Sequence, residues 1–189
     1  MPRTLRSALQ SALFLLIGFL FSVVADRPPA PVAAKAPNDV FSSERALSHL
    51  RRIAEQPRPV GSAAHQAARA YIEAAFRELG VEPQIQAATD LRFSSGRFTA
   101  TYVNNLIARL PGTANTKALL IAGHYDSVGS GPGASDDAHA VAAMLEVARG
   151  LRSGPPLKND VIFLVTDAEE LGLKGAQVFV DERDWTNDI

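Results

Sequence analysis

The chain has 189 residues, of which 47% are hydrophobic and 21% are charged, and its formal net charge is -1. This composition indicates a globular domain with a hydrophobic core, and the near-neutral charge provides no basic surface for nucleic acid. The sequence contains no cysteine, so disulfide scaffolds, thiolate nucleophiles and cysteine-ligated zinc fingers are excluded.

The N-terminal residues 1–25 combine a basic flank with a long apolar run. Arg3 and Arg6 precede "SALFLLIGFLFSVVA", which ends at Ala25. This order is typical of a signal peptide, with Val23 near a cleavage site, or of a signal-anchor helix that enters the membrane. A buried core helix is the disfavoured alternative, because nothing polar interrupts the centre of the run. Since arginines precede the run, we expect the rest of the chain outside the cytoplasm, in the periplasm, the exterior or the ER lumen.

A proline- and alanine-rich segment, residues 26–39, predicts an extended linker, so we expect the domain to occupy residues 40–189. Ser42 or Ser43 is suited to cap a first helix, which should end before Pro57.

The segment "GSAAHQAARAYIEAAFRELG" predicts a second helix. In the first helix, Leu47, Leu50 and Ile53 form an apolar stripe that should face inward. His49 and His65 lie on these helices, far from the motifs described below, and we interpret both as ordinary polar residues.

Strand-like and helix-like segments alternate in the second half of the chain. "TYVNNLIARL" and "KALLIAGHY" flank the turn signal "PGTANT" and predict a strand pair. "DVIFLVTD" is a continuous apolar run, as expected for a strand buried on both faces. From Lys117 onward the order is strand, helix, strand, helix, which predicts a βαβ unit with parallel strands. Because open α/β sheets form sites at the carboxyl ends of their strands, "HYDS" and "TDAEE" are expected at one edge.

The stretch "GHYDSVGSGPGASDDA", from Gly123 to Ala138, allows three interpretations. A phosphate-binding glycine loop is disfavoured, because the glycine spacing does not match and two aspartates open the following helix. A polar turn, with Asp136 or Asp137 capping that helix, is the default interpretation of a single acidic loop. A metal site is the third interpretation.

The metal interpretation gains from the positions of five residues. His124 and Asp126 are two apart on a strand, so both point to one face. Asp136 follows at the next helix start, and the neighbouring strand delivers Glu169 and Glu170. So many acids at one sheet edge would repel one another unless a cation neutralised them. Histidine with carboxylates suits zinc.

The motifs "GHYDSV", "GPGASDDA" and "TDAEELGLKGA", in this order and spacing, resemble the zinc aminopeptidases of metallopeptidase family 28. The resemblance covers about residues 40–189, which would be the N-terminal part of the catalytic domain. "PRPVGSAAHQAARAYI" is similar to the membrane-anchored subgroup related to the endoplasmic-reticulum metallopeptidases. Glutaminyl cyclases share this fold, but their second motif lacks the paired aspartates.

The resemblance implies a three-layer α/β/α sandwich with a mixed, mainly parallel sheet, and two zinc ions that activate a water to hydrolyse N-terminal peptide bonds. His124 would bind one zinc ion, Asp136 would bridge both and Glu170 would bind the second. Glu169 would be the general base, and Asp126 would orient His124. Peptides are the implied substrates, with a membrane contact through the N-terminal segment and no nucleic acid.

Two departures from the family pattern bear on this expectation. His139 stands where these aminopeptidases carry a small residue, and we expect it on the helix surface. The family also needs a further aspartate or glutamate and a histidine downstream of Glu170, and no histidine follows it here. We therefore expect the chain to be a fragment truncated at its C-terminus. The alternative function is a non-catalytic, peptidase-like binding domain or an inactive fragment.

Overall fold

The computed structural model describes residues 2–114, 116–182 and 189. The chain divides into two compact units between Pro31 and Val32. This boundary lies within the segment predicted as a linker, and residues 32–39 belong to the second unit.

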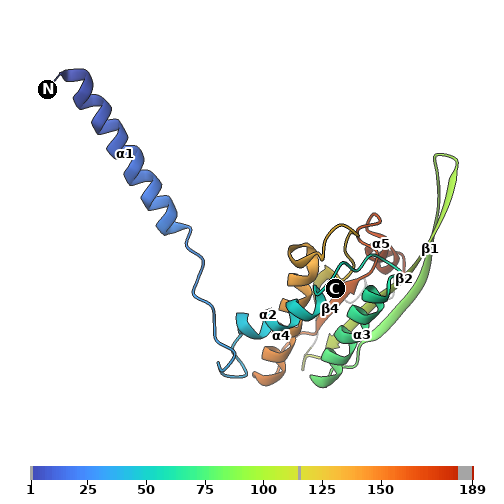
Figure 1. Ribbon diagram of the computed structural model, residues 1–189. Coiled ribbons are helices and arrows are strands. Elements are labelled where there is room, and N and C mark those ends of the chain that lie inside the picture. The colour runs from blue at the N-terminus through green and yellow to red at the C-terminus, as the bar shows by residue number, and fades with distance from the viewer. Residues whose placement is uncertain (1, 115, 183–188) are drawn as a thin grey trace. The chain divides into compact units, whose positions relative to one another are not determined.

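The first unit contains a single long helix, α1 (Arg3–Ala25) (Figure 1). Its apolar side chains are exposed: Phe14 is 77% and Phe21 is 74% accessible. Thr4–Ala25 is long and apolar enough to cross a membrane, a property that signal sequences share. The disfavoured interpretation as a buried core helix is wrong, because none of the most apolar window is buried.

Helix α2 (Ser43–Ile53) opens the second unit, and its N-cap is Ser42, whose hydroxyl accepts the N–H of Arg45. Ile53 is buried as predicted, whereas Leu47 is 41% exposed. Leu47 and Ile53 are six residues apart, which places them about 120° apart around a helix of 3.6 residues per turn. The predicted stripe is therefore too wide to be buried along its whole length.

Helix α3 (Ala63–Glu78) is capped by the Ser62 side chain, which accepts the N–H of His65 at 3.1 Å. Its buried face consists of five residues: His65, Ala68, Ile72, Ala75 and Phe76.

Four strands form one mixed sheet in the order β1-β2-β4-β3. They are β1 (Gln84–Ser94), β2 (Arg97–Leu110), β3 (Leu119–His124) and β4 (Val161–Thr166). β3 and β4 are parallel, whereas β2 is antiparallel to both β1 and β4. The predicted mixed sheet and βαβ unit are confirmed, with β3 and β4 as the parallel pair. The sheet was expected to be mainly parallel, but among the described strands the β1–β2 and β2–β4 pairings are antiparallel, because β1 and β2 are joined as a hairpin.

The predicted strand pair between β2 and β3 is wrong, because β4 lies between them. Leu106 of β2 is opposite Val165 of β4, and β3 pairs with the other edge of β4. All six residues of β4 are buried, so this strand gains most from the central position. The segment predicted as a hairpin turn instead donates the Thr113 N–H to the Leu157 carbonyl at 2.9 Å, beside the approach to β4.

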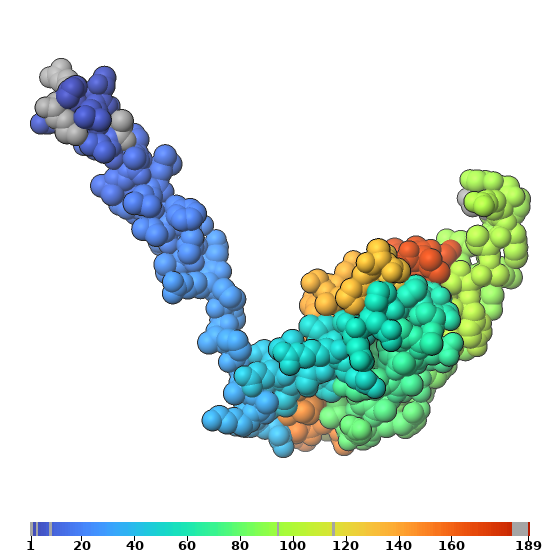
Figure 2. Space-filling view, viewed as in Figure 1, coloured from blue at the N-terminus to red at the C-terminus, as the bar shows by residue number. Residues whose placement is uncertain are grey.

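β1 and β2 form a hairpin that was not predicted as a pair. Phe93 is opposite Phe98 near its tip, and Ser95 and Gly96 adopt positive φ angles of 53° and 73° in the turn. The outer part of this hairpin stands clear of the body of the second unit (Figures 1 and 2).

Helices cover both faces of the sheet. The larger core cluster packs Leu106 and Phe163 against Ile72 and Phe76 of α3 and Leu145 of α4 (His139–Ser153). A second cluster on the opposite face contains Ile107, Ile162 and Leu164 of the sheet and Phe179 of α5 (Lys174–Asp181). Since neighbouring strand residues point to opposite faces, these two clusters establish the three-layer α/β/α arrangement.

A buried carboxylate fixes the start of the second unit. Glu146 of α4 is 0% exposed. It accepts the Ser42 N–H at 2.7 Å, Arg45 Nε at 3.0 Å and Arg149 Nε at 2.6 Å. Both arginines also donate to the Val40 carbonyl, so the residues before α2 are held against the helical layer.

Candidate metallopeptidase site

The ends of β3 and β4 meet at one edge of the sheet. His124, the last residue of β3, is opposite Thr166, the last residue of β4. The segments "HYDS" and "TDAEE" therefore leave the sheet side by side, as the sequence predicted.

The imidazole of His124 lies between carboxylates on both of its sides. Its Nδ1 is 3.3 Å from Asp126 Oδ1. Its Nε2 is 3.0 Å from Asp136 Oδ1 and 3.6 Å from Glu169 Oε2. Burial lowers the pKa of His124, but the hydrogen bonds with Asp126 and Asp136 outweigh it and raise this pKa to about 9. The edge thus favours a positive charge beside its acids.

Asp126 connects the segment that follows β3 with the segment that follows β4. It is 0% exposed, and its two oxygens accept the N–H groups of Glu169 at 3.0 Å and Glu170 at 3.1 Å. Burial alone would raise the pKa of Asp126, but these bonds and the one with His124 hold it below its ordinary value. An ionised Asp126 therefore fixes both the imidazole and the loop with the two glutamates.

Asp136 and Asp137 precede α4 instead of opening it, which corrects the predicted helix start. They share a cis peptide bond in a turn, η1 (Ala134–Ala138), and both have non-helical backbone angles. Asp137 does not cap the helix; its Oδ2 accepts the His124 N–H at 3.3 Å. Its other oxygen is 3.4 Å from His139, whose side chain is 60% exposed as predicted. The Asp136 carboxylate is consequently free of the helix end, and it is 77% exposed.

These residues offer the donor atoms that zinc accepts, one imidazole nitrogen and several carboxylate oxygens. The structure brings His124, Asp136 and Glu169 together, while Glu170 is placed through its backbone N–H alone. Within residues 2–114, 116–182 and 189, however, no group of three or more such side chains is arranged so that it could hold a metal ion. The chemistry of these donor atoms fits zinc.

Residues 105–189 match the sequence profile of peptidase family M28. This segment of the chain belongs to peptidase family M28. The matched region contains all five residues singled out from the sequence motifs, namely His124, Asp126, Asp136, Glu169 and Glu170.

Two relatives of this M28 domain are membrane or endoplasmic-reticulum proteases by name. The vacuolar membrane protease of Candida dubliniensis is 33% identical over 153 residues, which are 77% of this chain and 16% of that protein. Endoplasmic reticulum metallopeptidase 1 of Mus musculus is 40% identical over 96 residues, which are 49% of this chain and 11% of that protein. The chain thus spans about a sixth or less of the length of these relatives.

Solved structures share the fold. The glutaminyl cyclase of Porphyromonas gingivalis has a TM-score of 0.67 at 26% identity, over 76% of this chain and 54% of that chain. A zinc aminopeptidase from Bacillus subtilis has a TM-score of 0.66 at 17% identity, over 77% of this chain and 66% of that chain. The second likeness shows a zinc exopeptidase-like fold.

Arg58 supports the candidate site and was not recognised in the sequence. It is 0% exposed. Its guanidinium donates to the carbonyls of Tyr125 at 2.5 Å, Gly133 at 3.2 Å and Pro132, and its N–H donates to Ser127 Oγ at 2.9 Å. It therefore ties both ends of the loop between His124 and Asp136. An arginine between two prolines belongs to no periodic pattern, so the sequence contains no indication of this role.

His65 also lies at the site, which corrects its interpretation as distant from the motifs. Its Nε2 is 2.7 Å from Asp167 Oδ1, and its ring stacks on Tyr125 with centroids 4.7 Å apart. The other oxygen of Asp167 accepts the Asn104 N–H at 2.9 Å. His49 is an ordinary residue as predicted, with Nδ1 2.7 Å from the Tyr71 hydroxyl.

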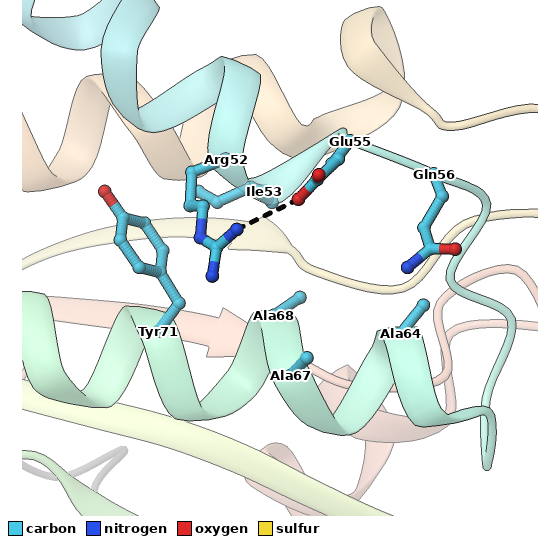
Figure 3. A pocket seen from close by; sticks show the side chains of 8 residues that line it. All are labelled: Arg52, Ile53, Glu55, Gln56, Ala64, Ala67, Ala68 and Tyr71. Carbon is cyan, nitrogen blue, oxygen red and sulfur yellow. Dashed lines mark hydrogen bonds and ion pairs between the residues drawn. The ribbon is translucent and has the colours of Figure 1, made fainter.

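A pocket of about 220 Å³ lies between α2 and α3 (Figure 3). Alanines of α3, with Tyr71, face Ile53 and Gln56 across it, and Arg52 pairs with Glu55 at 3.0 Å. None of the five motif residues lines this pocket, so it is separate from the candidate site.

Proposed function

We propose that this M28 domain is the N-terminal part of the catalytic domain of a zinc-dependent aminopeptidase, which hydrolyses N-terminal peptide bonds. The observation that carries the proposal is the convergence of Asp136 and Glu169 on Nε2 of His124, at 3.0 and 3.6 Å. This convergence occurs at the carboxyl edge of the sheet, where α/β folds form their sites.

His124, Asp136 and Glu170 would hold zinc, with Asp136 bridging two ions. When bound, zinc would lower the pKa of a water molecule and polarise the scissile carbonyl. Asp126 would act through its contact with Nδ1 of His124, because a metal-binding imidazole is oriented by a partner on its other nitrogen. The buried, ionised state of Asp126 supports this positioning role.

Glu169 would be the general base. Its backbone is fixed by Asp126, while its side chain is 32% exposed and points toward His124. A carboxylate held in this way can take a proton from the attacking water and return it to the leaving amine.

The helix α1 would attach the protein to a membrane or direct it there, with the M28 domain outside the cytoplasm. Its exposed apolar surface and the names of the relatives, a vacuolar membrane protease among them, support this assignment. Peptides would be the substrates.

Glu169→Gln in the full protein tests the proposed role. The substitution keeps the size of the side chain but removes the base, so turnover of an aminoacyl amide should fall by about 10²-fold or more. Zinc content, measured by emission spectroscopy, should stay unchanged. Glu78→Gln, the same change on the exposed face of α3, is the control. Retained turnover in the Glu169→Gln protein would contradict the assignment.

The alternative is a non-catalytic, peptidase-like binding domain. It is favoured by the observation that, within the described ranges, no group of three or more histidine and acidic side chains is arranged so that it could hold a metal ion. Stoichiometric zinc together with turnover supports the enzyme, whereas a purified protein that holds no zinc supports the binding domain.

A further inference from the structure

A second pocket, of about 430 Å³, opens beside the loop that carries the two glutamates. Three parts of the fold line it: the start of α3, the exposed half of β2 and the residue that follows Glu170. The lining residues that matter here are Val60, His65, Arg69, Ala100, Tyr102 and Leu171. A volume of this size is typical of small-ligand sites.

The pocket is lined in part by residues that are bonded to, or adjacent to, residues of the candidate site. Leu171 directly follows Glu170, whose N–H is bonded to Asp126. His65 is bonded to Asp167 and stacked on Tyr125, which lies between His124 and Asp126 in the chain. A ligand in this pocket would therefore contact the residues that hold the site together.

The accessible walls of the pocket are apolar. Tyr102 is 61% and Leu171 is 53% exposed, although both are large apolar side chains. The two basic side chains beside them have partners within the protein, since His65 pairs with Asp167 and Arg69 lies 3.6 Å from Glu73. Such walls favour an uncharged, apolar or aromatic group.

The hairpin extends this apolar surface outward. Leu91 is opposite Ala100 and Phe93 is opposite Phe98, so these four side chains share one face of the ribbon with Tyr102. Figure 2 shows this ribbon standing beyond the body of the second unit. The pocket thus forms the inner end of an apolar face that begins next to the glutamate loop.

We infer that this pocket binds an apolar or aromatic side chain of the peptide substrate, close to the scissile bond. The inference rests on the proposed function, because continuity with the Glu169–Glu170 loop identifies a peptide as the occupant. Tyr102 and Leu171 would be specificity-determining residues on opposite walls.

Fluorine NMR of the full chain in lipid nanodiscs tests the inference. The chain contains three tyrosines, so 3-fluorotyrosine labelling gives three signals, and Tyr102→Phe identifies the one of interest. The zinc-treated Glu169→Gln protein, which would not consume its ligand, is titrated with Phe-Gly-Gly, Gly-Phe-Gly and Gly-Gly-Gly. We expect a phenylalanine peptide to move the Tyr102 signal, whereas Gly-Gly-Gly should not and the Tyr71 signal should stay fixed. Whichever peptide moves the Tyr102 signal, Phe-Gly-Gly or Gly-Phe-Gly, shows whether the first or the second substrate residue enters the pocket.

A matched pair of variants locates the contact. Leu171→Ser should weaken binding of the phenylalanine peptide about tenfold, whereas Leu91→Ser, an exposed leucine of the same hairpin face outside the pocket, should not. A Tyr102 signal that ignores both phenylalanine peptides at millimolar concentration overturns the inference.

Turnover of the wild-type protein separates the inference from the proposed function. A shifted Tyr102 signal without any hydrolysis supports the pocket and rejects the aminopeptidase. Hydrolysis with an unmoved Tyr102 signal, and with equal kcat/KM for phenylalanine substrates in Tyr102→Ser, rejects the pocket and leaves the aminopeptidase standing.

Discussion

Asp126 and Asp136 carry the same functional group and lie on opposite sides of the His124 imidazole, yet their surroundings differ. Asp126 is 0% exposed and accepts two backbone N–H groups, whereas the Asp136 side chain is 77% exposed. On the Asp126 side of the imidazole, the carboxylate is paired with N–H groups of the protein. On the Asp136 side, the carboxylates of Asp136 and Glu169 remain accessible. We therefore expect the buried residues on the Asp126 side to control stability, and the accessible residues on the Asp136 side to control ligand binding.

The largest effect is expected at the buried Arg58. Arg58→Met keeps the length of the side chain but leaves the carbonyls of Tyr125, Pro132 and Gly133 without their donor. The bond to Tyr125 is buried and those to Pro132 and Gly133 are partly buried. Each unsatisfied group of this kind costs up to about 1–3 kcal/mol, so the free energy of unfolding should fall by about 3 kcal/mol or more. Denaturant unfolding measures this change. The control is Arg52→Met, which removes an exposed pair and should change stability by less than about 1 kcal/mol. Equal effects of the two substitutions would contradict a structural role for the buried Arg58 side chain.

Asp126→Asn tests both sides at once. The amide oxygen can accept one N–H, but the charge and the second acceptor are lost, so about 1–3 kcal/mol of stability should disappear. Loss of a partner that orients a metal-binding imidazole should also weaken zinc about 10- to 100-fold. Competition with a chromophoric chelator measures the zinc affinity. An unchanged affinity would show that Asp126 acts only as a structural residue.

Glu146, a second buried carboxylate, tests whether the loss of zinc affinity expected for Asp126→Asn follows from the removal of any buried carboxylate. Burial raises the pKa of Glu146, but the hydrogen bonds from Arg149, Ser42 and Arg45 hold it below its ordinary value of 4.5. Because the folded pKa is the lower one, its contribution is present above pH 4.5 and is lost as the pH falls through the folded value.

Glu146→Gln should therefore lower stability by about 1–3 kcal/mol at pH 7, and the difference from wild type should shrink below pH 4.5. Unfolding at a series of pH values measures it. Zinc affinity should not change, because Glu146 holds Ser42 and Arg45 and contacts none of the proposed ligands. A constant stability difference across pH would argue against an ionised Glu146 in the folded state.

The smallest effect is expected at the exposed His139. Its side chain is 60% exposed beside Asp137, so His139→Ala should change stability by no more than about 0.5 kcal/mol. Thermal unfolding measures this change. A clearly larger loss would mean that the Asp137 contact supports the turn that presents Asp136.

Local pattern predicted the pieces of this domain well. The continuous apolar run of β4 indicated a strand buried on both faces, and Ser42 was one of the two serines predicted as the N-cap of the first helix. Because parallel strands present their carboxyl ends at one edge of a sheet, the order of the elements also predicted that His124 and Glu169 would lie close together. Their roles, with those of Asp126, Asp136 and Glu170, remain proposals.

The sequence by itself thus determined the helices, the strands β2, β3 and β4, and the edge where the acids gather, because periodicity and capping depend on neighbours in the chain. The strand β1 was not predicted. The tertiary structure decided the rest. It inserted β4 between β2 and β3, since strand partners follow from the burial of both faces of β4 and not from the nearest turn. It also placed Arg58 and His65 under the site, where they bond to residues that are 67 and 102 positions away in the chain. Such contacts satisfy buried carbonyls and carboxylates that exist only once the layers have packed, so no local pattern could encode them.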